Sequence, residues 1–155
     1  MSRIFLDADI MLDVLAQRKP FYEPAANLLT LIETGQVSGC TSSLVFSNLY
    51  YVLRKLRGRG IALTSLRKLQ NFIDILAVGE RSIQFALNSA FNDFEDAIQY
   101  HTAIQHHVRY LITRNLKDYK ATDRSIVTIC TARDYLKLRD ASQYSVNLSA
   151  TTQEQ

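Results

Sequence analysis

Residues 91–119, FNDFEDAIQYHTAIQHHVRYLITRNLKDY, combine a predicted helix, a predicted strand and a polar loop in one short unit. The helix begins near Asp93, and Asp96 follows three residues later, so both carboxylates lie on the same side of it. The apolar run over residues 110–113 is too short for a core helix and predicts a fully buried parallel strand. Ligands bind at the carboxyl ends of such strands, so we expect a site among the polar residues at its end, Thr113, Arg114, Asn115 and Asp118.

The amino terminus repeats this arrangement. Residues 3–6 are a short apolar stretch that predicts a strand, and Asp7 follows it directly. Asp9 is the expected N-cap of the next helix. If the two strands are parallel in one sheet, Asp7 lies at the same edge as the polar loop, and the helix of the first unit brings Asp96 to it. Several carboxylates in one crevice repel one another unless a cation shares the site, which predicts a divalent metal ion.

Apolar strands alternate with amphipathic helices along the chain. Strands are expected at residues 3–6, 37–41, 76–78, 110–113 and 126–129. Helices are expected at residues 10–15, 21–34, 44–56, 64–75, 82–91, 93–107 and 132–138. This order predicts an α/β layered fold with a mostly parallel sheet and right-handed crossovers. We expect one domain over residues 1–138 and a flexible tail over residues 139–155, because the tail is polar and has little to bury.

The composition favours a single domain in a reducing compartment. A chain of 155 residues buries a sizeable core without disulfides, and Cys40 and Cys130 are expected to be small buried hydrophobes. No apolar run is long enough to span a membrane, and the first residues lack the pattern of a signal peptide, so we place the protein in the cytoplasm. The net charge is +3, and several cations concentrate in a cluster that predicts contact with a phosphate backbone and could equally be a solvated helical face: Arg54, Lys55, Arg57 and Arg59.

Each candidate carboxylate also has a purely structural explanation. Asp7 could simply cap the next helix, but matching acids at a second strand end exceed what capping requires. Asp93 is the most economical N-cap of its helix. Asp96 is followed by Ala97 and Ile98, which indicates that it faces inward, and an inward acid needs a partner. We therefore favour function for Asp7 and Asp96 and leave Asp93 open between capping and the site.

With these residues placed, the chain resembles the PIN domain family, metal-dependent ribonucleases typified by the toxins of bacterial toxin–antitoxin pairs. The resemblance spans residues 4–138 and rests on three stretches, FLDADIMLDVL, TSSLVFSNLYYVLRKL and above all DFEDAIQYHTAIQHHVRYLITRNLKDY. It implies a three-layer α/β/α fold with a mostly parallel central sheet of about five strands. It also implies Mg²⁺ or Mn²⁺ as the cofactor, RNA as the substrate, an antitoxin protein as a partner, and a homodimer.

The resemblance also implies roles for individual residues. Asp7 and Asp96 become the principal metal carboxylates. Asn115 and Asp118 match the region of the family's fourth acidic position, and Thr113 matches a hydroxyl often found there. The implied reaction is hydrolysis of an RNA phosphodiester bond, in which the metal stabilises developing charge and Asn115 or Asp118 orients the attacking water.

The chain departs from the family pattern at Asn48, where similar proteins usually carry a glutamate. An amide offers a neutral oxygen but no charge, so metal binding is expected to weaken or shift, unless Asp93 or Asp118 compensates. The alternative function is therefore a PIN-like RNA- or protein-binding module with weakened or absent catalysis. A haloacid dehalogenase-like phosphatase is discounted, because here the acidic DFED precedes the LITRN strand end, the reverse of the order those enzymes need.

Overall fold

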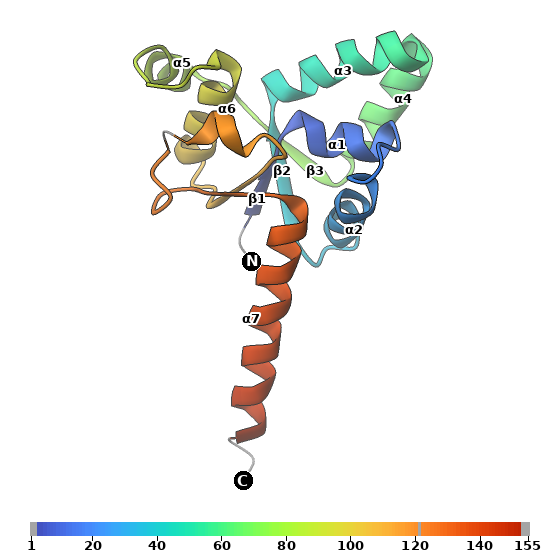
Figure 1. The fold of residues 1–155 in the computed structure, drawn as a ribbon. Helices are drawn as coiled ribbons and strands as arrows, with labels where there is room; N and C mark the ends of the chain where they lie inside the picture. Colours follow the sequence, from blue (N-terminus) through green and yellow to red (C-terminus); the bar gives the residue numbers. More distant parts are fainter. Residues whose placement is uncertain (1–2, 121, 153–155) are drawn as a thin grey trace.

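A computed structural model describes residues 3–120 and 122–152 of the chain. Within these residues the core is a five-stranded sheet in the order β3-β2-β1-β4-β5 (Figure 1). The strands are β1 (Arg3–Leu6), β2 (Ser38–Ser42), β3 (Ile73–Leu76), β4 (Tyr110–Ile112) and β5 (Thr128–Cys130). All four pairings are parallel, which confirms the predicted sheet.

Strand β1 occupies the centre of the sheet because it is apolar on both faces. Its residues 4–6 are fully buried, as a parallel strand covered on both sides requires. The sheet continues through β2 and β3 on one side of β1 and through β4 and β5 on the other. Asp7, the next residue, therefore lies at the topological switch point, where open sheets form a ligand crevice. Cys40 and Cys130 are free and buried, as expected.

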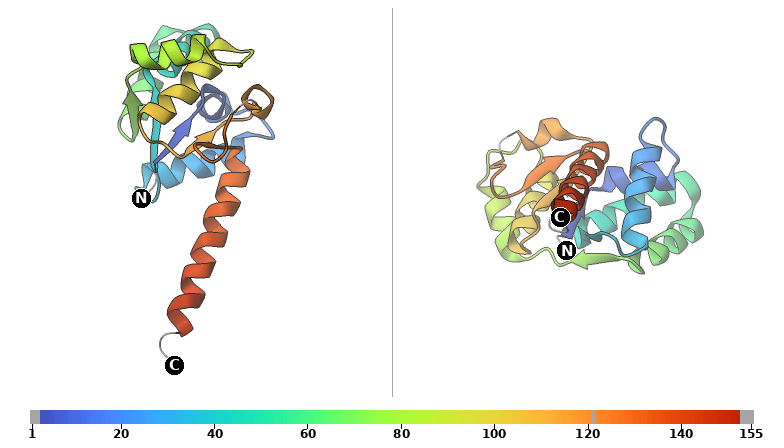
Figure 2. Two further views of the ribbon diagram at one scale, coloured as in Figure 1. Left: turned by 90° about the vertical axis from the view of Figure 1, so that its left-hand side faces the viewer. Right: turned by 90° about the horizontal axis from the view of Figure 1, so that it is seen from below.

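Helices cover both faces of the sheet. In the described residues they are α1 (Ala8–Leu15), α2 (Tyr22–Glu33), α3 (Ser43–Arg57), α4 (Arg59–Gln70), α5 (Glu80–Leu87), α6 (Phe94–Gln105), α7 (Ala132–Thr152) and the short 3-10 helix η1 (Leu116–Tyr119). Helices α5 and α6 pack together on one side, and α1, α2, α3 and α4 lie on the other (Figures 1 and 2). This arrangement confirms the predicted three-layer α/β/α fold.

The prediction for residues 64–78 is wrong at the boundary between helix and strand. Helix α4 begins earlier than expected, because Gly58 with its positive φ of 85° makes the whole turn after α3. The helix ends at Gln70, and β3 starts at Ile73, inside the predicted helix. Ile73 and Ile75 are two residues apart, the spacing of one strand face, and pairing with β2 over four residues selects the strand.

Helix α7 is far longer than predicted and extends away from the sheet (Figure 2). The sequence predicted a helix that ends at Leu138, whereas the helix continues to Thr152. Within this extension the hydroxyls of Ser142, Ser145 and Ser149 donate to carbonyls four residues earlier, so these polar side chains find partners inside the helix. The expected division between domain and tail thus falls inside one helix, and residues 153–155 of that tail lie outside the described residues.

No helix in the described part of the chain has both the length and the hydrophobicity needed to cross a bilayer.

Candidate active site

Asp7 is anchored at the junction of β1, β4 and α1. Its backbone N–H donates to the Ile112 carbonyl at 3.0 Å, which continues the ladder between the two strands. Its side chain caps α1 by accepting from the Ala8 N–H at 2.8 Å. The other carboxylate oxygen accepts from the Thr113 hydroxyl at 3.1 Å. Both predicted residues therefore meet at the carboxyl edge of the sheet.

Tyr119 joins Asp7 to Asp96. Its hydroxyl lies 3.4 Å from Asp7 Oδ2 and 3.2 Å from Asp96 Oδ1, and its side chain is buried. A phenol has one proton, so it donates to one of the two carboxylates at a time. Burial, followed by the charges of the two carboxylates, raises the pKa of Tyr119 far above its ordinary value and keeps it neutral. No role was predicted for Tyr119 from the sequence, because nothing in the local pattern indicates that its side chain turns back toward β1.

A second group of carboxylates surrounds Asp96. Oxygen atoms of Asp93, Asp96 and Asp118 all lie within 4.8 Å of one another. Asp93 is the N-cap of α6, as expected, and accepts from the Asp96 N–H at 2.9 Å. The Asn115 side-chain amide donates to Asp118. The structure thus brings together the predicted residues Asp7, Asp93, Asp96, Thr113, Asn115 and Asp118.

The negative charges of these carboxylates have little compensation from nearby cations. Burial, then the charge of Asp9, raises the pKa of Asp7 to about 6. Burial, then the charges of Asp7 and Asp93, raises the pKa of Asp96 to about 8. Among the described residues, no lysine or arginine forms an ion pair with Asp7 or Asp96. Protonation relieves the repulsion between these carboxylates at low pH, and a bound divalent cation would relieve it at higher pH.

Asp9 belongs to the same edge, although the sequence predicted only a capping role for it. That prediction is wrong, since Asp7 caps α1. Asp9 Oδ2 instead accepts from the Arg114 N–H at 2.9 Å and lies 3.3 Å from the Thr113 hydroxyl. Asp9 Oδ1 is buried and has no hydrogen-bond partner among the described residues. An orphaned buried carboxylate oxygen and a set of hard oxygen donors both fit a divalent cation.

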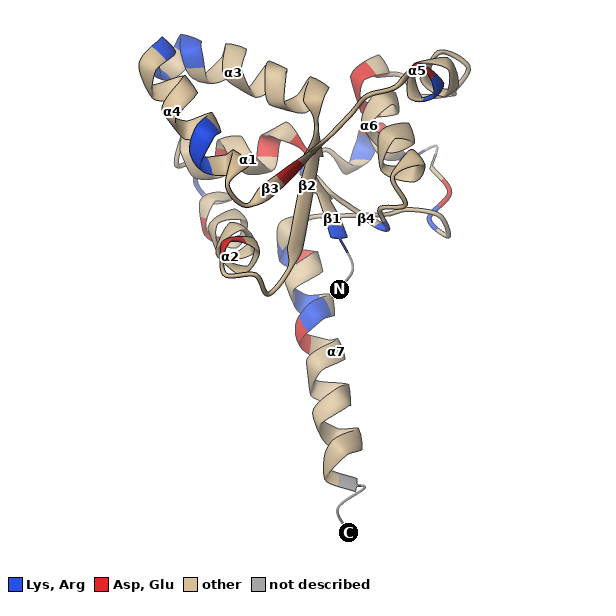
Figure 3. Cartoon of the chain, turned by 180° about the vertical axis from the view of Figure 1, so that it is seen from behind, with Lys and Arg blue, Asp and Glu red and all other residues tan. Residues whose placement is uncertain are grey.

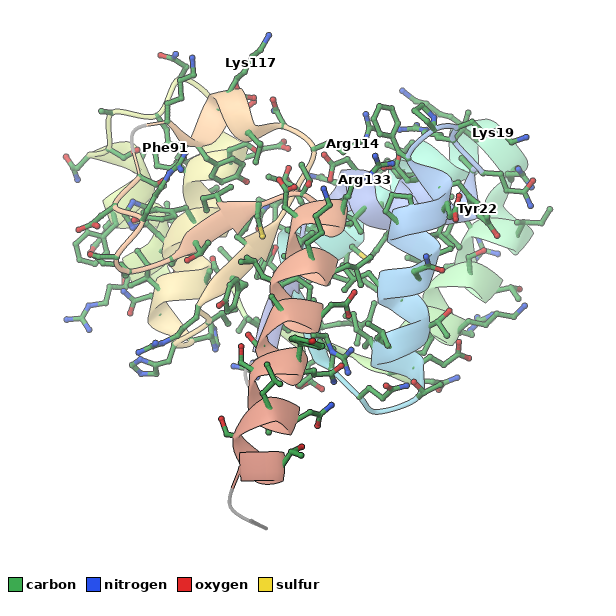
Figure 4. The ribbon with its side chains drawn as sticks, turned by 60° about the horizontal axis from the view of Figure 1, so that its bottom comes forward. Lys19, Tyr22, Phe91, Arg114, Lys117 and Arg133 are labelled. Atoms are coloured by element: carbon green, nitrogen blue, oxygen red, sulfur yellow. The ribbon has the colours of Figure 1, made fainter. Side chains whose placement is uncertain are left out.

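The loop after β4 is held by an ion pair. Asp13 is fully buried and receives two hydrogen bonds from the Arg114 guanidinium, at 2.8 and 3.0 Å. The same guanidinium lies 4.0 Å from the centre of the Phe21 ring. Arg114 and Arg133 both line a cavity of about 340 Å³ between α2 and the start of α7 (Figure 4). Arg114 therefore ties this loop to α1 at two points, through its guanidinium to Asp13 and through its backbone N–H to Asp9.

Asn48 and Glu95 meet beside Asp7 and Asp96. The Asn48 amide on α3 donates to Glu95 Oε2 on α6 at 3.1 Å. All four side chains line one groove of about 380 Å³. Asn48 was expected near the site from the sequence and Glu95 was not, because contact between α3 and α6 cannot be inferred from local spacing.

The predicted RNA-binding cations lie away from the acids. Arg54, Lys55 and Arg57 occupy the last turn of α3, and Arg59 opens α4. All four are exposed and form the tip where the two helices join (Figure 3). This tip is at the opposite end of α3 from its N-cap Ser42, which is the last residue of β2.

A parallel sheet of this order, with carboxylates gathered at its switch point, defines an α/β protein whose site is suited to a divalent cation. The chain belongs to the PIN domain family, whose model matches residues 3–117. It is 24% identical over 132 residues to the protein named Ribonuclease VapC1 of Aquifex aeolicus (strain VF5). That alignment covers 82% of this chain and 90% of the relative.

Solved structures share the fold. The DNA-bound VapBC structure from Salmonella typhimurium matches with a TM-score of 0.63 at 15% identity, over 85% of this chain and 99% of the other. A toxin–antitoxin complex from Klebsiella pneumoniae matches with a TM-score of 0.60 at 22% identity, over 83% of this chain and 97% of the other. The family resemblance read from the sequence is confirmed.

Proposed function

We propose that this protein is a metal-dependent ribonuclease that hydrolyses RNA phosphodiester bonds and acts as the toxin of a toxin–antitoxin pair. One observation carries the proposal: carboxylates of Asp7 and Asp96, from different elements, converge on the single hydroxyl of Tyr119 with no cationic side chain paired to them in the described residues. The naming of a relative as a ribonuclease, and the toxin–antitoxin complexes among similar structures, support the substrate and the partner.

In this proposal Asp7 and Asp96 hold Mg²⁺ or Mn²⁺. The bound ion would supply charge neutralisation at the scissile phosphate and make water a stronger nucleophile. The chain's own residues position the ligands: Thr113 and Tyr119 orient Asp7 by hydrogen bonds. Asn115 and Asp118 are hydrogen-bonded to each other beside Asp96, where they can orient the attacking water.

The RNA backbone is proposed to contact the basic tip formed by Arg54, Lys55, Arg57 and Arg59. Exposed cations there attract phosphates without base specificity. An antitoxin partner, a homodimer and a cytoplasmic location complete the proposal.

Metal titration calorimetry with Mn²⁺ tests the proposal, together with cleavage of a mixed RNA pool. Asp7→Asn and Asp96→Asn should each abolish metal-dependent cleavage and weaken Mn²⁺ binding while the far-ultraviolet circular dichroism is unchanged. Undiminished cleavage by purified Asp96→Asn protein would reject the assignment of this carboxylate.

A binding module without catalysis is the second candidate, and Asn48 is the observation that favours it. The two functions separate cleanly in one assay. RNA or partner binding that is independent of Mn²⁺, with no cleavage product, identifies the binding module.

A further inference from the structure

The contact between Asn48 and Glu95 places a carboxylate where the family resemblance expects one. An amide nitrogen only donates hydrogen bonds, so Asn48 holds Glu95 by its Oε2 and turns an acid of α6 toward α3. Glu95 is exposed and forms no ion pair among the described residues, so no cation competes for this carboxylate.

Glu95 also shares its groove with the two principal carboxylates. The described residues that line this groove include Asp7, Asn48, Glu95 and Asp96, whereas Asp93 and Asp118 are not among them. The two acids that the sequence offered as replacements for the missing glutamate therefore do not line this groove, although their oxygens lie close to Asp96. Glu95 is the acid that contacts Asn48 within this groove.

We propose that Glu95 supplies the third carboxylate of the metal site, with Asp7 and Asp96, and that Asn48 is a positioning residue which holds it there. The acidic charge lost from α3 is thus restored from α6, one residue before Asp96. This inference rests on the proposed metal-dependent function. It makes the site a full acidic set, which favours an active ribonuclease over a binding module.

The test is calorimetric titration of Mn²⁺ into four full-length proteins: the unaltered chain, Glu95→Gln, a matched control Glu33→Gln, and the exchange Asn48→Glu with Glu95→Gln. Glu33 is exposed at the end of α2, before β2, and so lies at the opposite edge of the sheet. Glu95→Gln should weaken Mn²⁺ binding about ten-fold or more, Glu33→Gln should have no effect, and the exchange should recover most of the affinity. Thermal unfolding checks that each variant is folded.

The outcomes separate this inference from the function on which it rests. Absence of Mn²⁺ binding to the unaltered chain rejects the metal-dependent function itself. Strong binding to the unaltered chain with equal binding to Glu95→Gln rejects the role of Glu95 and leaves the function standing. An exchange protein as weak as Glu95→Gln rejects the claim that positions 48 and 95 serve the same part of the site.

Discussion

Two aspartates at opposite ends of α1 have contrasting surroundings. Asp13 is fully buried and is matched by the guanidinium of Arg114 through two hydrogen bonds. Within the described part of the chain, Asp7 receives only neutral donors, from Ala8, Thr113 and Tyr119. A buried charge with its own counter-ion stabilises the fold only as long as both partners are present, whereas an acid without one is available to bind a cation. The comparison separates a structural carboxylate near the end of α1 from a proposed metal ligand at its N-cap.

The largest expected effect is on the unpaired side of this comparison. Asp7→Asn should reduce metal-dependent RNA cleavage roughly 10³-fold or more, since it removes a proposed metal ligand. The thermal midpoint of the metal-free variant should stay the same or rise, because the substitution removes repulsion between carboxylates. Cleavage rates and thermal unfolding on the same preparation check both halves, and a strongly destabilised variant would contradict the contrast with Asp13.

On the paired side, Arg114→Ala should lower the free energy of unfolding by about 3 kcal/mol, because it leaves Asp13 buried without its counter-ion. Chemical denaturation measures this loss. The double variant Asp13→Asn with Arg114→Met is the matched control and should lose less, since no buried charge remains. Equal stability of Arg114→Ala and the unaltered chain would show that the ion pair does not support the fold.

The stability of the metal-free protein should fall as the pH rises, because Asp7 and Asp96 have no cationic partner among the described residues. The pKa values of Asp7, about 6, and Asp96, about 8, exceed that of an unfolded aspartate, so the folded state binds more protons. Their stabilising contribution is complete below about pH 4 and is lost as the pH rises through 6 and 8. After allowance for solvent screening, the free energy of unfolding of the metal-free protein should fall by about 2 kcal/mol over this pH range. The thermal midpoint should fall by roughly 5 °C.

Addition of Mn²⁺ should remove most of this decline, because the cation replaces the protons. Differential scanning calorimetry from pH 5 to pH 8.5, with and without Mn²⁺, makes the measurement. Asp96→Asn is the control and should flatten the metal-free profile. A midpoint that rises with pH in the metal-free protein has the opposite sign and would contradict the raised pKa values.

The smallest effect is expected at the bridge between the two carboxylates. Tyr119→Phe removes one buried hydrogen bond and should cost about 1 kcal/mol of unfolding free energy. Mn²⁺ affinity should change less than in Glu95→Gln, because the tyrosine orients the ligands without supplying charge. Chemical denaturation measures the change in unfolding free energy, and Mn²⁺ titration measures the change in affinity. Together they separate the effect of orienting the carboxylates from the effect of their charge.

Much of the candidate site follows from local patterns. Asp7 and Thr113 were expected at one edge because each ends a short apolar run, and parallel strands place their carboxyl ends together. Asp93 was expected as an N-cap because capping depends on neighbours within one turn. The residues that were missed, Tyr119 and Glu95, make contacts across long separations: Tyr119 with Asp7 over 112 positions, and Glu95 with Asn48 over 47.

The sequence alone therefore establishes the α/β order, the parallel sheet and the acids at its carboxyl edge, since strand period, helix period and capping act over a few residues. Tertiary packing decides which aspartate caps α1, where α4 gives way to β3, and which acid faces Asn48. Those outcomes depend on which surfaces meet when helices cover the sheet, and a carboxylate's partner or lack of one is settled only then. The distinction between Asp7 and Asp13 is of this second kind, because both are aspartates of one helix and only the fold brings Arg114 to one of them.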